Sequence, residues 1–200
     1  MWVARYPDRF LLGVGVGHPE VIAEYRSPYQ TILNYLDELD SACVPKQDRI
    51  LAAFGPRTIR VAGERTAGAH PFMTTPAHTR QARTILGAGP LLAPEQKVVL
   101  TTDADYAHSI GRQMFGPTLK MANYRNSMVR MGFTGEQADT ASDEVLDAVI
   151  AHGPPDDLVS RLNAHLDAGA DHVSAYILTA SGDVDDEYRR ALRALADALP

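Results

Sequence analysis

Short apolar runs alternate with longer amphipathic segments along most of this chain of 200 residues. Each run has the length of a buried strand, and the segment that follows it carries apolar residues at helical spacing. The pattern predicts five strands, at residues 9–16, 49–54, 69–74, 96–101 and 172–178. Strands that alternate with helices form βα units, so we expect a parallel sheet with both faces covered.

The helical segments are bounded by proline and glycine signals. Residues 56–67 and 76–86 each begin with proline and precede a glycine, as helices commonly do. A long segment at 103–131 is expected to break at Gly116-Pro117, because proline cannot continue the helical hydrogen bonds. The other predicted helices span residues 28–40, 142–152, 156–168 and 185–199.

Two parallel architectures are compatible with this alternation. A doubly wound sheet suits five strands and would make the chain a nucleotide-binding domain, whereas a closed (β/α)₈ barrel needs eight strands and about 250 residues. The chain contains no internal linker or repeat, so we expect a single domain over residues 1–200.

Composition excludes several classes of protein. Nineteen basic residues against 25 acidic ones give a formal charge of −6, which argues against nucleic acid or an anionic membrane as the partner. Cys43 is the single cysteine, so neither an internal disulfide nor a thiolate metal cluster is expected. The sequence has no apolar run of membrane-spanning length and no signal-peptide pattern, so we expect a cytoplasmic protein.

Residues 13–18, with the sequence GVGVGH, are the first candidate for chemistry. They end a predicted strand, where glycines let a backbone approach a ligand closely. The dinucleotide pattern G-x-G-x-x-G is not met, because the third glycine comes one position early and Pro19 follows. A plain glycine-rich turn and a ligand loop both remain open at this point.

The turn Gly55-Pro56-Arg57-Thr58 is the second candidate. It leads from a strand into a helix whose free amides and positive dipole end favour a phosphate or carboxylate, and Arg57 adds a charge. A well-capped turn without a ligand is the alternative interpretation.

Hydroxyls and imidazoles offer weaker signals. Thr74 and Thr75 lie at a strand end, where one of them is expected to cap the next helix. His108, His152, His165 and His172 show no metal-ligand spacing, so no metal site is predicted and these histidines are assigned structural or surface roles.

Five stretches, in order, resemble the bacterial luciferase-like flavin and deazaflavin oxidoreductases, and in particular an actinobacterial branch that depends on coenzyme F-420. They are RYPDRFLLGVGVGH (5–18), LAAFGPR (51–57), AGAHP (67–71), GPLLAPEQ (89–96) and AHLDAGADHV (164–173). The resemblance implies a (β/α)₈ barrel with the cofactor at the carboxyl ends of the strands. It also implies hydride transfer to or from a small organic substrate.

The resemblance assigns roles to the candidate residues. It places Gly15, Val16 and Gly17 beside the cofactor, and gives His18 the position of a catalytic acid or base. It assigns the cofactor phosphate to the turn formed by Gly55, Pro56, Arg57 and Thr58, and the substrate mouth to Thr74 and Thr75.

The match also implies a shortened barrel. On this alignment the chain begins just before the fourth barrel strand, so the first three βα units are absent and the barrel is incomplete. Two unpaired strand edges would then be exposed, which favours a homodimer. An FMN-dependent monooxygenase of the same family, and a catalytically silent barrel fragment that acts as a binding or assembly module, remain the alternatives.

Overall fold

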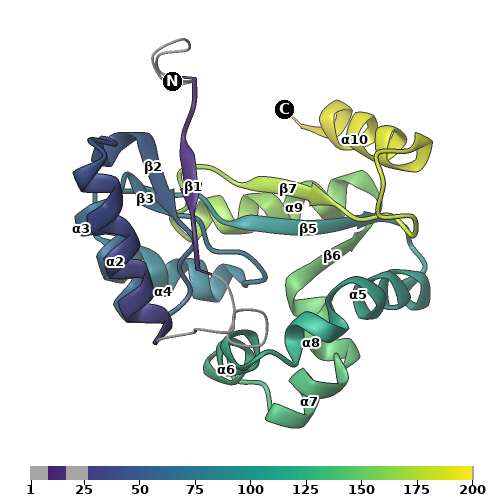
Figure 1. Cartoon of the computed structure of the whole chain (residues 1–200). Coiled ribbons are helices and arrows are strands. Elements are labelled where there is room, and N and C mark those ends of the chain that lie inside the picture. The colour runs from purple at the N-terminus through teal and green to yellow at the C-terminus, as the bar shows by residue number, and fades with distance from the viewer. Residues whose placement is uncertain (1–8, 17–26, 200) are drawn as a thin grey trace.

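Two small parallel sheets form the framework of the protein (Figure 1). The computed structural model describes residues 9–16 and 27–199. The first sheet has the order β1-β2-β3-β4 and the second the order β6-β5-β7, and all neighbouring strands are parallel. The strands are β1 (Leu12–Val14), β2 (Arg49–Leu51), β3 (Gly68–Ala69), β4 (Leu91–Leu92), β5 (Glu95–Leu100), β6 (Ile150–Gly153) and β7 (Ser174–Ile177).

The two sheets continue into one another through the link between β4 and β5. On one side of this link, the amide of Ala93 donates to the carbonyl of Ala69 at 3.0 Å. On the other side, the amide of Ser174 donates to the carbonyl of Pro94 at 2.9 Å. The strands β1, β2 and β3, the segment formed by β4 and β5, and β7 therefore lie side by side in chain order.

The prediction of five strands located each of them but missed two others. Within the described residues, β4 and β6 are additional strands. The predicted helix at 142–152 was wrong at its end: α8 (Asp143–Val149) stops at Val149, and Ile150 begins β6, paired with Lys97 of β5. Ile150 and Ala151 are buried, and an apolar run of this kind fits a central strand as well as a helix.

Helices follow most of the strands. Figure 1 shows α2, α3 and α4 beside the β1–β3 strands, and α6, α7 and α8 gathered together at the base of β6. Four of the helices carry proline in the first turn, as the sequence suggested for several of them. The remaining bounds are α2 (Pro28–Ser41), the 3₁₀ turn Lys46–Asp48, α3 (Pro56–Arg65), α4 (Pro76–Leu86), α5 (Ala104–Leu119), α6 (Ala122–Arg130), α7 (Gly135–Thr140), α9 (Pro155–Asp167) and α10 (Asp186–Ala198).

Two helix boundaries correct the sequence prediction. Pro117 lies inside α5, and the break comes later, at Lys120, because the buried side chain of Leu119 holds the last turn against the core. The helix α3 ends at Arg65, and Gly68 belongs to β3 instead of terminating the helix. A Cβ on Gly68 would lie 1.8 Å from the carbonyl oxygen of Leu91, so this glycine permits β3 and β4 to approach one another.

Three clusters of buried apolar side chains pack the helices against one another and against the two sheets. One packs α2, α3 and α4 on the first sheet, a second fills the space among α5, α6, α7 and α8, and the third joins the second sheet to α9 and α10. Among the helices of the described residues, none is long and apolar enough to cross a membrane.

Candidate functional site

A pocket of about 210 Å³ lies where β1, β2 and β3 end. Ligands of parallel α/β proteins bind beyond the carboxyl ends of the strands, so the pocket lies where this fold class places its sites. Its walls come from the ends of these strands and from the starts of α2 and α3, and α6 closes the remaining side. The lining residues are Gly15, Val16, Pro28, Ile32, Ala52, Phe54, Gly55, Thr58, Phe72, Asn123, Tyr124, Asn126 and Arg130.

The glycine-rich stretch after β1 contributes two of its predicted residues to this pocket. Gly15 and Val16 line it, whereas Gly17 and His18 lie outside the described residues. A Cβ on Gly15 would lie 3.4 Å from the Cβ of Ala52, so the glycine stands close against the end of β2. At Gly15, therefore, only the backbone forms the wall of the pocket.

The turn before α3 contributes Gly55 and Thr58. Gly55 precedes the helix in an extended conformation, and the Thr58 hydroxyl donates to its carbonyl at 2.9 Å. The amide of Ile59 makes the first helical bond, also to Gly55, at 3.0 Å. The amides of Arg57 and Thr58 come before that bond, so they have no acceptor within the helix and carry its positive dipole end.

Pro56 and Arg57 do not line the pocket. Pro56 occupies the first turn of α3, which its fixed backbone angle suits. The guanidinium carbon of Arg57 lies 3.9 Å from the ring centre of Tyr29 on α2, so this side chain stacks on an aromatic ring. Toward the pocket, the predicted turn therefore presents chiefly backbone amides and not the Arg57 guanidinium.

The helix α6 supplies a wall that the sequence analysis missed. Asn123, Asn126 and Arg130 follow one another at spacings of three and four residues, which places them on one helical face, and all three line the pocket. That spacing is the sequence signal for this wall, whereas the prediction of one long helical segment at 103–131 assigns these residues no role.

An aromatic cluster forms the apolar side of the pocket. The ring centres of Phe54 and Phe72 lie 4.6 Å apart, and Tyr124 packs on both at 5.6 and 5.7 Å. Burial, assisted by the negative charge of Glu95, raises the pKa of Tyr124 to about 12, so its hydroxyl stays protonated at neutral pH. The pocket therefore combines an apolar aromatic face with amide and guanidinium groups.

The residues predicted for the substrate mouth are not part of this pocket's lining. Thr75 caps α4, since its hydroxyl accepts from the amide of His78 at 3.2 Å. Thr74 is buried, and its hydroxyl has no hydrogen-bond partner within the described part of the chain. The ring of His78 lies behind the site with Nε2 2.9 Å from the carbonyl oxygen of Phe54, and burial lowers its pKa.

No family model and no curated protein matches the sequence. Among solved structures, an F-420-dependent secondary alcohol dehydrogenase in complex with an F-420–acetone adduct is similar, with a TM-score of 0.69 at 12% identity. That alignment covers 97% of this chain and 72% of the dehydrogenase.

Two further structures align over a smaller share. A coenzyme F-420-dependent tetrahydromethanopterin reductase from Methanopyrus kandleri gives a TM-score of 0.53 at 15% identity, over 76% of this chain and 49% of the reductase. An EDTA monooxygenase from Chelativorans gives 0.45 at 14%, over 78% and 49%, too distant for any argument. The first two likenesses show the fold, an incomplete (β/α) barrel, and decide against the doubly wound sheet.

Proposed function

We propose that the chain is a luciferase-like oxidoreductase that binds coenzyme F-420 and serves hydride transfer to or from a small organic substrate, because it shares the fold of two F-420-dependent enzymes. The observation that carries the proposal is the pocket at the carboxyl ends of β1, β2 and β3. It joins the glycine loop and the start of α3, the two places to which the sequence resemblance assigns the cofactor.

The start of α3 suits the phosphate of such a cofactor. Gly55 presents no side chain, and a Cβ there would meet only the Thr58 hydroxyl, at 3.9 Å. A phosphate oxygen can therefore approach the amides of Arg57 and Thr58 without a steric barrier. Helix N-termini of this kind bind phosphate through their free amides and dipole.

The aromatic side of the pocket suits a planar ring. Phe54, Phe72 and Tyr124 offer an apolar surface, and Asn123 and Asn126 offer donors and acceptors at its border. The volume of about 210 Å³ is below the 300–1,000 Å³ typical of small-molecule sites. The described residues thus make room for part of a deazaflavin, not for all of it.

The cofactor, when bound, supplies the hydride chemistry, and the protein supplies binding and orientation. In this proposal, Gly15 and Val16 place the backbone of the glycine loop beside the ring. Phe54 and Phe72 exclude water from its face. His18 is proposed as the acid or base near the reacting atoms, because imidazole titrates in the useful range.

Substrate contact is proposed for Thr74 and Thr75, on the family resemblance. Thr74 has a buried hydroxyl without a protein partner among the described residues, so it retains hydrogen-bonding capacity. Thr75 already accepts from the amide of His78 and donates to the sulfur of Met131 at 4.0 Å, so a substrate would have to displace this weak sulfur contact to bind its hydroxyl.

A fluorescence titration tests the proposal. The purified chain is titrated with F-420 and, separately, with FMN, while cofactor fluorescence is followed. Saturable binding of F-420 at one per chain supports the proposal, and preferential binding of FMN supports the flavin monooxygenase alternative. If neither cofactor binds at high micromolar concentration, the proposal fails and a silent binding module becomes the better account.

The proposal includes a homodimer in the cytoplasm. Both β1 and β7 are edge strands, and Phe10, Leu11 and Tyr176 expose large apolar surfaces beside them. Edge strands with exposed apolar side chains tend to pair with another chain. Light scattering coupled to size exclusion measures the mass, and a monomer at micromolar concentration contradicts the dimer. Cys43, free and exposed, would stay reduced in the cytoplasm.

A further inference from the structure

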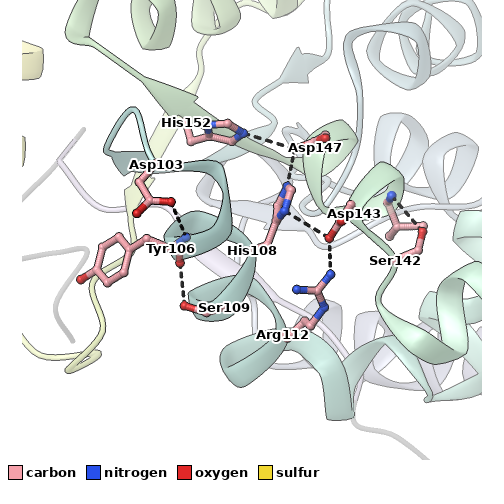
Figure 2. Close-up of polar contacts among 10 residues, drawn as sticks. Asp103, Tyr106, His108, Ser109, Arg112, Ser142, Asp143, Asp147 and His152 are labelled. Carbon is pink, nitrogen blue, oxygen red and sulfur yellow. Dashed lines mark hydrogen bonds and ion pairs between the residues drawn. The ribbon is translucent and has the colours of Figure 1, made fainter.

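Two histidines and an aspartate from three different elements converge away from the pocket (Figure 2). His108 lies on α5, Asp147 on α8 and His152 on β6. The Oδ1 atom of Asp147 lies 2.7 Å from Nε2 of His108 and 3.2 Å from Nε2 of His152. One potential ligand atom from each of the three residues lies within 4.8 Å of the other two.

These separations are close to those of a zinc site. Tetrahedral zinc holds nitrogen and oxygen ligands about 2.0–2.1 Å from the metal, so neighbouring ligand atoms lie about 3.3 Å apart. The two contacts at Asp147, 2.7 and 3.2 Å, are both shorter than that separation, so a small opening of the cluster would admit an ion.

Asp143 provides an independent indication. Its Oδ1 lies 3.1 Å from Nδ1 of His108, on the opposite edge of the ring from Asp147, and it also pairs with Arg112 (Figure 2). A carboxylate on the far nitrogen of a metal-binding histidine fixes the ring tautomer and increases its basicity. With the proton held on Nδ1, the lone pair of Nε2 faces the position between Asp147 and His152.

Neighbouring residues hold the cluster in place, and solvent can reach it. The His108 side chain is buried, whereas His152 is partly exposed and Asp147 is exposed. His152 and Asp147 line an open cavity of about 380 Å³ together with Asp157 and Arg161. The Arg161 guanidinium donates to the carbonyl of Asp147 at 3.0 Å, which holds that turn in place. An ion could therefore enter from solvent and keep one position for water.

The geometry points to a divalent transition-metal site formed by His108, Asp147 and His152, with Asp143 orienting His108. Imidazole nitrogens suit zinc, whereas Mg²⁺ prefers oxygen ligands alone, so Zn²⁺ is the expected ion. The bound metal would tie α5, α8 and β6 together. The rival interpretation is a metal-free cluster in which both imidazoles donate to Asp147.

The test is a Zn²⁺ titration of the full chain, free of any histidine tag, by calorimetry and by thermal denaturation. We expect one Zn²⁺ per chain and a higher Tm with Zn²⁺, with no response to Mg²⁺. His152→Ala is the main variant, because its side chain is partly exposed and its loss leaves the core intact; affinity should fall at least tenfold. Asp143→Asn should weaken binding by about tenfold, in the range seen for outer partners of metal-binding histidines.

His172→Ala is the matched control, since this exposed histidine lies outside the cluster. It should bind Zn²⁺ as the unaltered chain does. Two outcomes overturn the proposal: no Zn²⁺ bound at millimolar concentration, or equal affinity in the His152→Ala and His172→Ala proteins. Neither readout depends on F-420, so failure here is separate from failure of the proposed function.

Discussion

The hydroxyl of Thr79 lies 2.8 Å from Nδ1 of His165, joining α4 to α9 in a fully buried contact. On the other edge of the ring, Nε2 lies 3.0 Å from Oε1 of Gln96. The Gln96 amide group donates to the carbonyls of Lys97 and Val149, which fixes its oxygen toward the histidine. Nε2 must therefore carry the proton, and Nδ1 accepts from Thr79, so the neutral ring is fully satisfied.

The neutral His165 predicts a loss of stability in acid. Burial, with the positive charge of Arg161, lowers its pKa from 6.5 to about 4. The unfolded chain takes up this proton as pH falls through 6.5, whereas the folded chain does not. The neutral His165 therefore makes its full contribution to the free energy of unfolding above pH 6.5. Between pH 6.5 and pH 4 this contribution is lost, which lowers the free energy of unfolding by about 2–3 kcal/mol.

Urea denaturation at pH 7.5 and pH 4.5 measures this loss. In His165→Gln the difference between the two pH values should shrink by about 2 kcal/mol, because the titrating group is gone. His172→Gln, at an exposed histidine, should retain the full difference. An unchanged difference in His165→Gln would show that other groups cause the acid sensitivity.

The side chain of Arg83 is expected to make a large contribution to the free energy of unfolding. Its guanidinium donates to the carbonyls of Gly87, Gly169 and Pro90 at 2.8, 2.8 and 3.0 Å, and it pairs with Asp171. Arg83→Met should lower the free energy of unfolding by about 2–4 kcal/mol, since several partly buried acceptors lose their donor. Arg80→Met, at an exposed arginine of the same helix, should stay within about 0.5 kcal/mol. Similar values for both variants would contradict the prediction.

No side chain larger than that of glycine is expected to fit at position 68 in the first sheet. In Gly68→Ala the new Cβ would collide with the backbone of Leu91, which cannot move without breaking the pairing of β3 and β4. We expect a loss of about 3 kcal/mol or more, or insoluble protein. Gly13→Ala, in β1, has no atom within 4 Å of the added Cβ and should unfold like the unaltered chain. Chemical denaturation of the two variants gives the comparison, and equal stability would rule out the clash.

Gly55 offers a test that separates folding from cofactor binding. Aspartate at this position is a favourable helix N-cap, and the extended backbone and open space admit its side chain. Gly55→Asp should therefore keep or raise stability, while its charge repels a phosphate at the start of α3 and weakens F-420 binding at least tenfold. Gly55→Asn, a neutral cap of similar size, should weaken binding less. F-420 affinity is measured by fluorescence. Equal affinity in the two variants would contradict the proposal that the cofactor phosphate binds at the start of α3.

Local patterns determined much of the framework. Proline and glycine placed α4 at its observed bounds, and apolar runs located β1, β2, β3, β5 and β7, because these signals depend on residues close in sequence. The same signals failed at Gly68, where the glycine is needed for a neighbouring strand and not for a helix end. They failed again at Ile150, because pairing with β5 decides between strand and helix there.

One part of the candidate site was likewise predicted from the sequence, and another part was visible only in the structure. Gly15, Val16, Gly55 and Thr58 were identified from their places at strand ends, where the alternation of strands and helices gathers ligand-binding loops. Asn123, Asn126 and Arg130 line the pocket because α6, which comes much later in the chain than the first strands, packs beside it. Likewise, His108, Asp147 and His152 have no metal-ligand spacing along the chain, and three separate elements bring them together. The sequence by itself determined most of the elements and the strand-end loops that line the pocket. The tertiary structure decided which distant side chains meet, because contacts between elements depend on packing that no local pattern encodes.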